Sequence, residues 1–139
     1  MDERRYELAT LAAARRLRSS YCALAHGKVL ADKFLDSDEV ADLARGRDVD
    51  SLDEIDRAVL ELADKVATDA TTVDQKDIDR LRALGLSDAD VLDVVLAAAA
   101  RCFYSKTLDA LGVEPDSAYG DLPADLRDAL TVGRPIGAA

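Results

Sequence analysis

The stretch Ser19-Ser20-Tyr21-Cys22-Ala23-Leu24-Ala25-His26 separates two helical patterns near the start of the chain. Before it, Leu8, Leu11 and Ala12 are spaced by three and four residues, which predicts a helix from about residue 2 to residue 17. Ser19 and Ser20 interrupt that pattern and can cap a second helix over residues 21–34. The chain is therefore expected to begin with two consecutive helices that meet at these serines.

Capping signals predict further helices along the rest of the chain. Residues with strong helix propensity dominate the composition, whereas runs of β-branched residues are nearly absent. We expect a third helix from Ser37 to Gly46, a fourth from the capping box of Ser51 and Glu54, a fifth from Thr72 with Gln75 to Gly85, the longest from Ser87 with Asp90 to Gly112, and a short last one at Pro123. The prediction is an all-α bundle of six or seven helices, a single domain over residues 1–133 with a flexible tail over residues 134–139.

The charge and hydropathy of the chain exclude several classes of partner. With 18 basic and 28 acidic residues among 139, the formal net charge is −10, so the chain is expected to repel nucleic-acid phosphates and anionic membrane surfaces. The longest stretch without a charged residue, residues 19–27, is far shorter than the roughly 20 apolar residues of a transmembrane helix. Because no secretory signal is visible either, we expect a cytoplasmic protein without nucleic-acid or membrane partners.

Cys22 and His26 carry the chemistry that the sequence offers. Because they are four residues apart, they lie on one face of the second helix, with Cys22 in its first turn, where the helix dipole favours a thiolate. A neutral imidazole one turn away can accept the thiol proton, directly or through water, and Arg15, Arg16 and Arg18 upstream add positive potential. The alternative is a buried cysteine that acts as a small hydrophobic residue. A metal site is not expected, because the chain has only one other cysteine and no other histidine.

Residues 19–26 resemble the active-site segment of the AhpD-like (alkylhydroperoxidase) and carboxymuconolactone decarboxylase superfamily, whose second helix begins Cys-x-x-Cys-x-x-x-His. The segment from Tyr21 to His26 matches the second half of that motif. Glu7 lies twelve residues before Ser19, as the relay glutamate of the family's peroxidases lies before their first motif cysteine. Residues 86–96 and 108–116 are similar to the superfamily's second conserved block. The resemblance covers residues 2–116 and implies an AhpD-like helical bundle.

The resemblance also implies a peroxidase that uses a thiol and no cofactor. Carried over to this chain, Cys22 is the thiol that reacts with a hydroperoxide, and His26 and Glu7 form a proton relay through water. Tyr21 beside them can orient a substrate or donate to a peroxide oxygen, and the alternative is that it only packs. Ser19 stands where the family has its first cysteine, so the family's disulfide cannot form here, although Ser19 can still donate a hydrogen bond to the Cys22 thiolate. A sulfenic acid at Cys22 then needs another partner, and we expect that partner to be an external thiol reductant.

Three interpretations of the function stay open at this point. The first is an alkylhydroperoxidase-like antioxidant oxidoreductase, and the second is a catalytically lapsed oligomeric binding protein, which the missing first cysteine favours. The third is a lyase of the carboxymuconolactone decarboxylase type, which works by acid–base chemistry and leaves Cys22 dispensable. Cys102 is either a resolving thiol or, as we expect, a buried structural one.

One segment predicts self-association. Residues 94–100 are apolar on every side, which is unusual for a surface helix and indicates burial in the fold or against another subunit. The resemblance likewise implies a symmetric homo-oligomer, commonly a trimer or a hexamer. We therefore expect the chain to associate with copies of itself.

Overall fold

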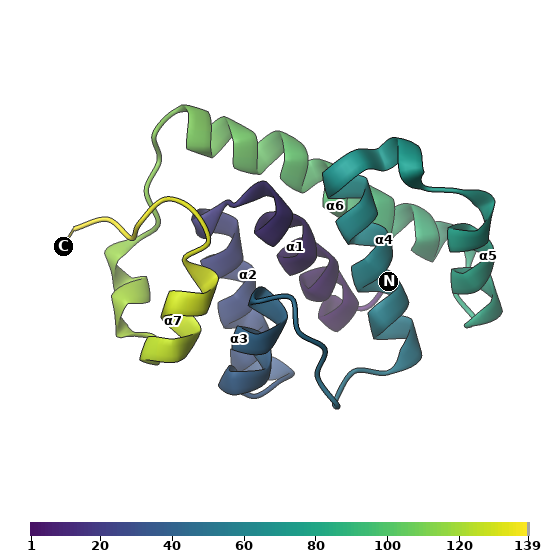
Figure 1. Ribbon diagram of the computed structural model, residues 1–139, viewed down its shortest axis with the longest axis horizontal. Coiled ribbons are helices and arrows are strands. Elements are labelled where there is room, and N and C mark those ends of the chain that lie inside the picture. The colour runs from purple at the N-terminus through teal and green to yellow at the C-terminus, as the bar shows by residue number, and fades with distance from the viewer. Residues whose placement is uncertain (139) are drawn as a thin grey trace.

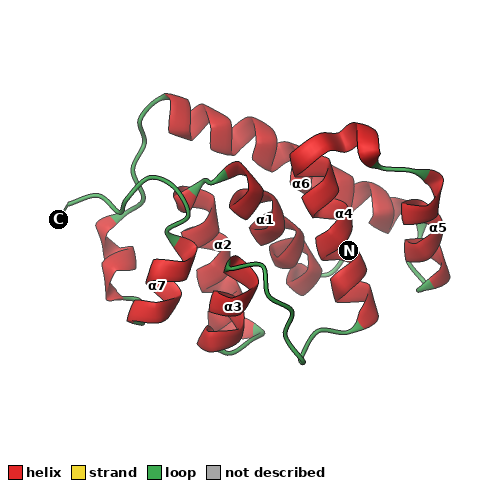
Figure 2. Cartoon of the chain, in the orientation of Figure 1, coloured by secondary structure: helices red, strands yellow, loops and turns green. Residues whose placement is uncertain are grey.

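The computed structural model describes residues 1–138, and over those residues it confirms the all-α prediction (Figure 1, Figure 2). Its elements are α1 (Glu3–Leu17), α2 (Ser20–Lys33), α3 (Ser37–Ala44), α4 (Glu54–Asp69), η1 (Ala70–Thr72), α5 (Gln75–Ala83), α6 (Asp88–Ala110), η2 (Ser117–Asp121) and α7 (Ala124–Leu130). The described residues contain no strand. Among the helices of this part of the chain, none combines the length and the apolar character that crossing a membrane requires.

Helix α1 runs through the middle of the bundle, in contact with α2 and α3 on one side and with α4 and α6 on the other (Figure 1). The eight consecutive residues from Glu7 to Ala14 are buried, which a helix shows only when its neighbours cover it all round. Four of the eight are alanines, and their small side chains let the neighbouring helices approach closely. This burial is what brings Glu7 into the interior.

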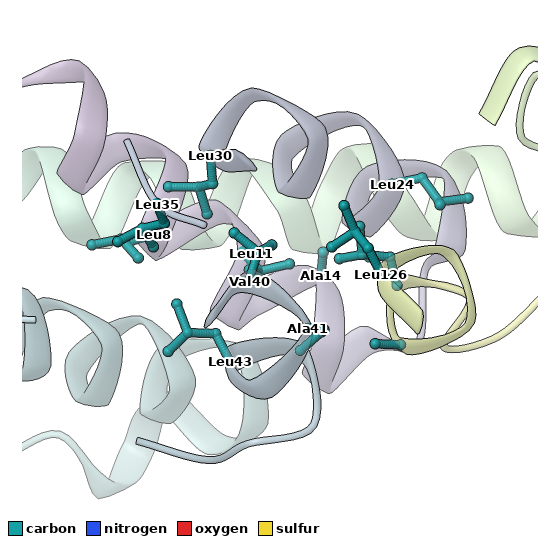
Figure 3. Packing of buried hydrophobic residues seen from close by; sticks show 14 of the residues in the cluster. Leu8, Leu11, Ala14, Leu24, Leu30, Leu35, Val40, Ala41, Leu43 and Leu126 are labelled. Carbon is teal, nitrogen blue, oxygen red and sulfur yellow. The ribbon is translucent and has the colours of Figure 1, made fainter. Parts of the chain in front are cut away.

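The buried apolar side chains form two clusters, one on each side of α1. The first cluster packs α1 against α2, α3 and α7, and Figure 3 shows Leu8, Leu11, Leu30 and Leu126 among its members. The second cluster packs α1 against α4, α5 and α6. Cys22 belongs to the first cluster, so the packing that holds the fold together also fixes the start of α2.

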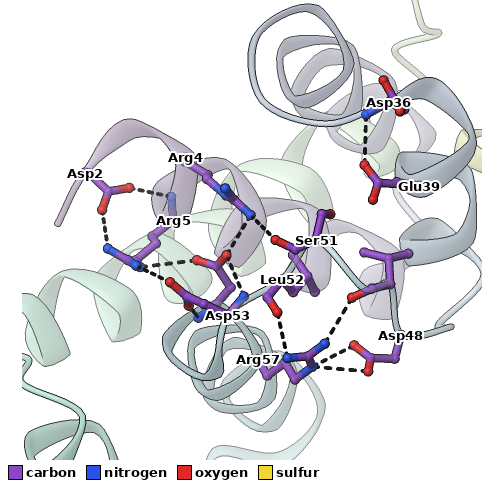
Figure 4. Close-up of polar contacts among 12 residues, drawn as sticks. Asp2, Arg4, Arg5, Asp36, Glu39, Asp48, Ser51, Leu52, Asp53 and Arg57 are labelled. Carbon is purple, nitrogen blue, oxygen red and sulfur yellow. Dashed lines mark hydrogen bonds and ion pairs between the residues drawn. The ribbon is translucent and has the colours of Figure 1, made fainter.

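Helix α4 begins two residues later than its predicted capping box. Asp53 and Asp56 form the box in place of Ser51 and Glu54. Asp56 is buried, and two arginines of α1 pair with its carboxylate at 2.8 and 3.2 Å, in the polar network of Figure 4. These ion pairs tie the start of α4 to α1. They are a tertiary effect that a local capping pattern does not contain.

Aspartates also replace the predicted N-caps of α3 and α5. Asp36 caps α3 one residue before the predicted serine, and Asp74 caps α5 two residues after the predicted threonine. The box of Ser87 and Asp90 at α6 is confirmed. Pro123 precedes α7 as its N-cap instead of occupying the first helical position.

The residues after α7 lie against the start of α2. Gly133 donates its backbone N–H to Ser20 Oγ at 2.8 Å, and a Cβ at Gly133 would collide with the carbonyl oxygen of Arg18. Further along, the backbone N–H of Gly137 donates to the carbonyl of Pro115 at 3.0 Å. The segment predicted to be a flexible tail, residues 134–139, therefore contacts the domain. Its mobility stays a prediction, and Ala139 lies outside the described residues.

Candidate functional site

Cys22 lies in the first turn of α2, where the chain turns out of α1. Helix α1 ends on Arg18, which adopts the left-handed conformation (φ 55°), and Ser19 is the N-cap of α2. The Cys22 side chain is only 1% exposed. Its Sγ accepts a hydrogen bond from Ser105 Oγ of α6, with 3.1 Å between the two atoms. The sulfur is buried, but it has a polar partner.

Glu7, His26 and Arg101 form a hydrogen-bonded chain through the imidazole ring. His26 Nδ1 lies 2.6 Å from Glu7 Oε2, and His26 Nε2 lies 3.2 Å from Arg101 Nη1. A guanidinium has donors and no acceptor, so Nε2 accepts from Arg101, and Nδ1 carries the proton donated to Glu7. His26 is therefore the neutral Nδ1–H tautomer, with the lone pair of a base on Nε2. The ring of Tyr6 meets the imidazole edge-on, with 6.1 Å between the ring centroids.

One face of α6 covers one face of α2 at this site. Cys22 and His26 are four residues apart on α2, and their partners Ser105 and Arg101 are four residues apart on α6 in the reverse order. Residues four apart share a helix face, so the two helices pass each other antiparallel here. Glu7 of α1 completes the arrangement. The site thus joins residues of three helices that are up to about a hundred positions apart in the sequence.

The imidazole sits in a mostly buried, charge-compensated environment. The side chains of His26 and Glu7 are 17% and 9% exposed. Burial lowers the pKa of His26 below its ordinary value, and the charge of Arg101 lowers it further, while the Glu7 carboxylate opposes both. The lowering prevails, so His26 is neutral near pH 7 and is available as a base.

This direction of the His26 pKa predicts how stability changes with pH. In the unfolded chain a histidine binds a proton near pH 6.5, whereas folded His26 binds it only at lower pH, so below about pH 6.5 the unfolded state holds more protons. The contribution of His26 to the free energy of unfolding is therefore complete above about pH 7.5 and decreases as the pH falls. Urea denaturation of the wild type and of His26→Gln should show a difference between them that shrinks from about pH 7.5 to about pH 5.5. A difference that grows on acidification would mean that Glu7 raises the pKa of His26 instead.

Ser19 and Tyr21, the other two predicted site residues, lie beside Cys22 in the chain but differ in environment. Ser19 is completely buried, and its Oγ has no hydrogen-bond partner among the described residues. Tyr21 is partly buried against the first apolar cluster. Tyr119 of η2 packs against the same cluster, and burial raises the pKa of its phenol.

The arginine at the site is not one of those predicted from the sequence. Arg15 and Arg16 both pair with Asp64 of α4, and Arg18 donates to a backbone carbonyl after α7. Asp64 therefore compensates the charges of Arg15 and Arg16, and the Arg18 guanidinium points to the segment after α7, so the positive potential expected beside Cys22 does not come from these arginines. The contact with the imidazole comes from Arg101 instead.

The sequence reasoning missed both residues that α6 contributes. A signal for them was present: Arg101 and Ser105 follow Val94 and Ala98 at three- and four-residue steps, so they continue the inward face of an otherwise apolar helix. A charged and a polar residue on such a face need buried partners. Which partners they find depends on the crossing of α6 over α2.

Several other contacts at the site bear on the sequence predictions. Both cysteines are free thiols, and Cys102 is partly exposed rather than buried as expected. Within residues 1–138, Cys22 and His26 share no hydrogen bond, because Ser105 occupies the sulfur and Arg101 occupies the imidazole nitrogen. No group of three or more acidic, cysteine or histidine side chains in that range is arranged to hold a metal ion.

Solved structures with the same fold are peroxidase-related proteins and a debrominase. A protein described as alkylhydroperoxidase AhpD core, an uncharacterized peroxidase-related protein from Ralstonia eutropha JMP134, is 25% identical with a TM-score of 0.72, over 86% of this chain and 63% of that one. An uncharacterized peroxidase-related protein from Silicibacter sp. TM1040 is 19% identical with a TM-score of 0.78, over 87% of this chain and 63% of that one. The debrominase Bmp8, as a cysteine-to-alanine variant in complex with 2,3,4-tribromopyrrole, is 16% identical with a TM-score of 0.75, over 93% of this chain and 67% of that one.

The chain therefore has the same fold as these AhpD-core and peroxidase-related proteins, as the resemblance of residues 19–26 predicted. The chain spans 63% of the length of the first two structures. No family model matches the sequence, and no curated protein matches it.

Proposed function

We propose that this chain is a thiol-dependent oxidoreductase that reduces hydroperoxides, with Cys22 as the nucleophile and with Glu7 and His26 as the proton relay. The observation that carries the proposal is the 2.6 Å hydrogen bond between His26 Nδ1 and Glu7. It orients a neutral imidazole whose basic Nε2 belongs to the residue one helical turn from the Cys22 thiol. A thiol becomes a nucleophile when a base oriented by a third group can take its proton.

The proposed reaction has two balanced parts. First, the Cys22 proton passes to His26, the sulfur attacks the outer oxygen of the hydroperoxide, the S–O bond forms and the O–O bond breaks. The sulfur loses two electrons, the hydroperoxide is reduced, and His26 returns the proton to the leaving alkoxide to give an alcohol. Second, a small thiol attacks the resulting sulfenic acid, releasing water and forming a mixed disulfide. Another thiol molecule then reduces that disulfide and restores Cys22.

The neighbouring residues have proposed roles in the same cycle. Arg101 leaves Nε2 when His26 accepts the proton, and its charge then stabilises the leaving alkoxide. Tyr21 orients the hydroperoxide. The reductant is external because Ser19 cannot form a disulfide, and the thiol pool that suits such a cycle is found in the cytoplasm.

A second candidate is a lapsed member of the superfamily that binds other molecules without catalysis. The burial of Cys22 favours it, because a substrate reaches a sulfur that is 1% exposed only when nearby side chains move. Turnover separates the candidates: purified protein is given an alkyl hydroperoxide with glutathione, and then with a dithiol. Peroxide consumption supports the oxidoreductase. No consumption with any thiol, together with slow alkylation of Cys22, establishes the lapsed protein. Lactone-acid decarboxylation retained in Cys22→Ser would establish the lyase.

We also propose that the protein is a homo-oligomer, a trimer or a hexamer, that associates through α6. The inward face of this helix is buried in the fold, but Leu92, Leu96 and Phe103 on one outward stripe are 56%, 55% and 76% exposed. Large exposed apolar stripes mark interaction surfaces, and a second copy of the same stripe is a matching partner.

Substitutions on this stripe should therefore shift the oligomeric state. Sedimentation of the wild type at micromolar concentration should give an oligomer, and Leu96→Glu with Phe103→Glu should give a monomer that keeps its helical circular dichroism. Lys76→Glu, an exposed change on α5 and therefore away from the stripe, is the matched control and should remain oligomeric. A monomeric wild type would contradict this proposal.

A further inference from the structure

Ser19 is a buried hydroxyl without a hydrogen bond. The residue is 0% exposed, its Oγ has no partner among the described residues, and as the N-cap of α2 it makes no side-chain capping bond. The two other fully buried serines are both satisfied, since Ser20 Oγ accepts from Gly133 N–H and Ser105 Oγ donates to Cys22 Sγ. Leaving a buried hydroxyl unpaired is unfavourable, because the hydroxyl loses its hydrogen bonds to water and gains none in the protein, so an exception of this kind calls for a functional explanation.

The same molecule shows what a serine at this position pairs with. At the start of α6, Ser87 is the N-cap and Asp90 is the third helical residue, and Ser87 Oγ donates to Asp90 Oδ2 at 2.6 Å. At the start of α2, Ser19 is the N-cap and Cys22 is the third helical residue. Both helix starts thus place a serine at the N-cap and a side chain with a possible acceptor at the third helical position, a sulfur in α2 and a carboxylate in α6. At α6 the Ser87 hydroxyl also accepts the backbone N–H of Asp90, a capping bond that Ser19 does not make.

Oxidation of Cys22 gives the third helical position of α2 an oxygen acceptor too. In an aspartate the charged oxygen is two bonds from Cβ, and in a cysteine sulfenate the charged oxygen is also two bonds from Cβ. An oxygen on the Cys22 sulfur is therefore as far along the side chain as the carboxylate oxygen that accepts from Ser87 at the start of α6. The backbone N–H of Ser19 already donates to the carbonyl of Ala14 at 3.0 Å, so the hydroxyl is the donor that Ser19 has left.

We propose that the Ser19 hydroxyl donates a hydrogen bond to the oxygen of a Cys22 sulfenate and holds this oxidised form until a thiol arrives. The proposal rests on the proposed function for the source of the oxygen. Thiolate and hydroperoxide give sulfenic acid and alcohol as proposed above: the S–O bond forms, the O–O bond breaks, and His26 protonates the leaving alkoxide. The sulfenic acid then gives its proton to the neutral His26, which leaves the sulfenate. Ser105 keeps its bond to the sulfur throughout. Ser19 is then a positioning residue of the oxidised state, and it has no partner in the reduced one.

The lifetime of the sulfenate tests this assignment. Wild-type protein receives one equivalent of hydroperoxide without thiol, and a carbon acid such as dimedone is added after increasing delays to trap the sulfenate for peptide mass spectrometry. We expect a persistent Cys22 adduct in the wild type and a lifetime shorter by about tenfold in Ser19→Ala, since a hydrogen bond to a charged group is lost. Ser20→Ala is the matched control, and its lifetime should equal that of the wild type, because the Ser20 hydroxyl is already used by Gly133.

The variants also report on folding. Ser19→Ala removes a group that makes no bond, so its thermal midpoint should be at least that of the wild type. Ser19→Gly, with a residue well tolerated at N-caps, is a second deletion of the hydroxyl should alanine disturb the turn. Equal sulfenate lifetimes in the wild type and in both variants overturn the proposal, as does a wild type in which no adduct forms.

Failure here differs from failure of the proposed function. If the sulfenate lifetime falls in Ser19→Ala but no thiol reduces the sulfenate, the role of Ser19 is supported and the proposed oxidoreductase cycle is wrong. If peroxide is turned over steadily but the sulfenate lifetimes of the wild type and of Ser19→Ala are equal, the proposed function is supported and the role of Ser19 is wrong.

Discussion

Cys22→Ala is expected to abolish thiol-dependent hydroperoxide reduction, with a loss of at least about 10³-fold that reaches the uncatalysed background. The sulfur is the only atom of the site that can accept the peroxide oxygen, because Glu7, His26 and Arg101 move protons or stabilise charge but are not oxidised. The measurement is the initial rate of hydroperoxide consumption at fixed glutathione, corrected for the reaction of glutathione alone.

Cys102→Ala is the matched control for that loss. Cys102 is a free, partly exposed thiol that makes none of the hydrogen bonds of the site. Its removal should leave the rate within about twofold of the wild type, as for a surface substitution away from the reacting atoms. Equal losses of hydroperoxide consumption in Cys22→Ala and Cys102→Ala would identify Cys102 as the resolving thiol. An unchanged rate in Cys22→Ala would contradict a mechanism that uses this thiol.

His26→Ala is expected to lower the second-order rate of the peroxide reaction by about 10²–10⁴-fold, the usual contribution of a positioned general base. The effect arises because Nε2 is the basic nitrogen nearest along the helix to the thiol, and because its tautomer is fixed by Glu7. Glu7→Gln should lower this rate less than His26→Ala does, since the glutamine carbonyl still accepts from Nδ1–H and keeps the ring in place. Stopped-flow rates under single-turnover conditions separate this step from thiol reduction.

Tyr6→Phe is the control for the relay. Tyr6 packs its ring edge-on against the imidazole, and phenylalanine keeps that ring. Its rate should stay close to that of the wild type, which shows that packing around His26 alone does not produce the loss. A His26→Ala rate within about threefold of the wild type would remove the imidazole from the chemistry and leave Ser105 as the sulfur's functional partner.

The start of α2 and its relation to α1 could be predicted from local sequence. Two serines between two amphipathic patterns define the helix break, and the four-residue step from Cys22 to His26 defines a shared face. The helix break and the shared face are short in sequence, so helix geometry alone comes close to fixing them. Glu7 was predicted only through the family resemblance, and the structure brings it to hydrogen-bond distance of His26.

The contribution of α6 could not be predicted in the same way. Ser105 is 83 residues from Cys22, and Arg101 is 75 residues from His26. Whether they meet depends on how α6 crosses the bundle, which is decided by packing of apolar side chains and not by any local pattern. The displaced cap of α4 has a similar cause, because the ion pairs of Asp56 with α1 favour a start at Asp53.

The most direct measurement is peptide mass spectrometry of Cys22 after a short hydroperoxide pulse, with and without glutathione. We predict a single added oxygen on Cys22 without the thiol, and a glutathione mixed disulfide at the same residue with it, while Cys102 stays unmodified. A Cys22 that remains an unmodified thiol under both conditions, in protein that is folded and helical, would contradict the assignment of this sulfur as the reactive centre.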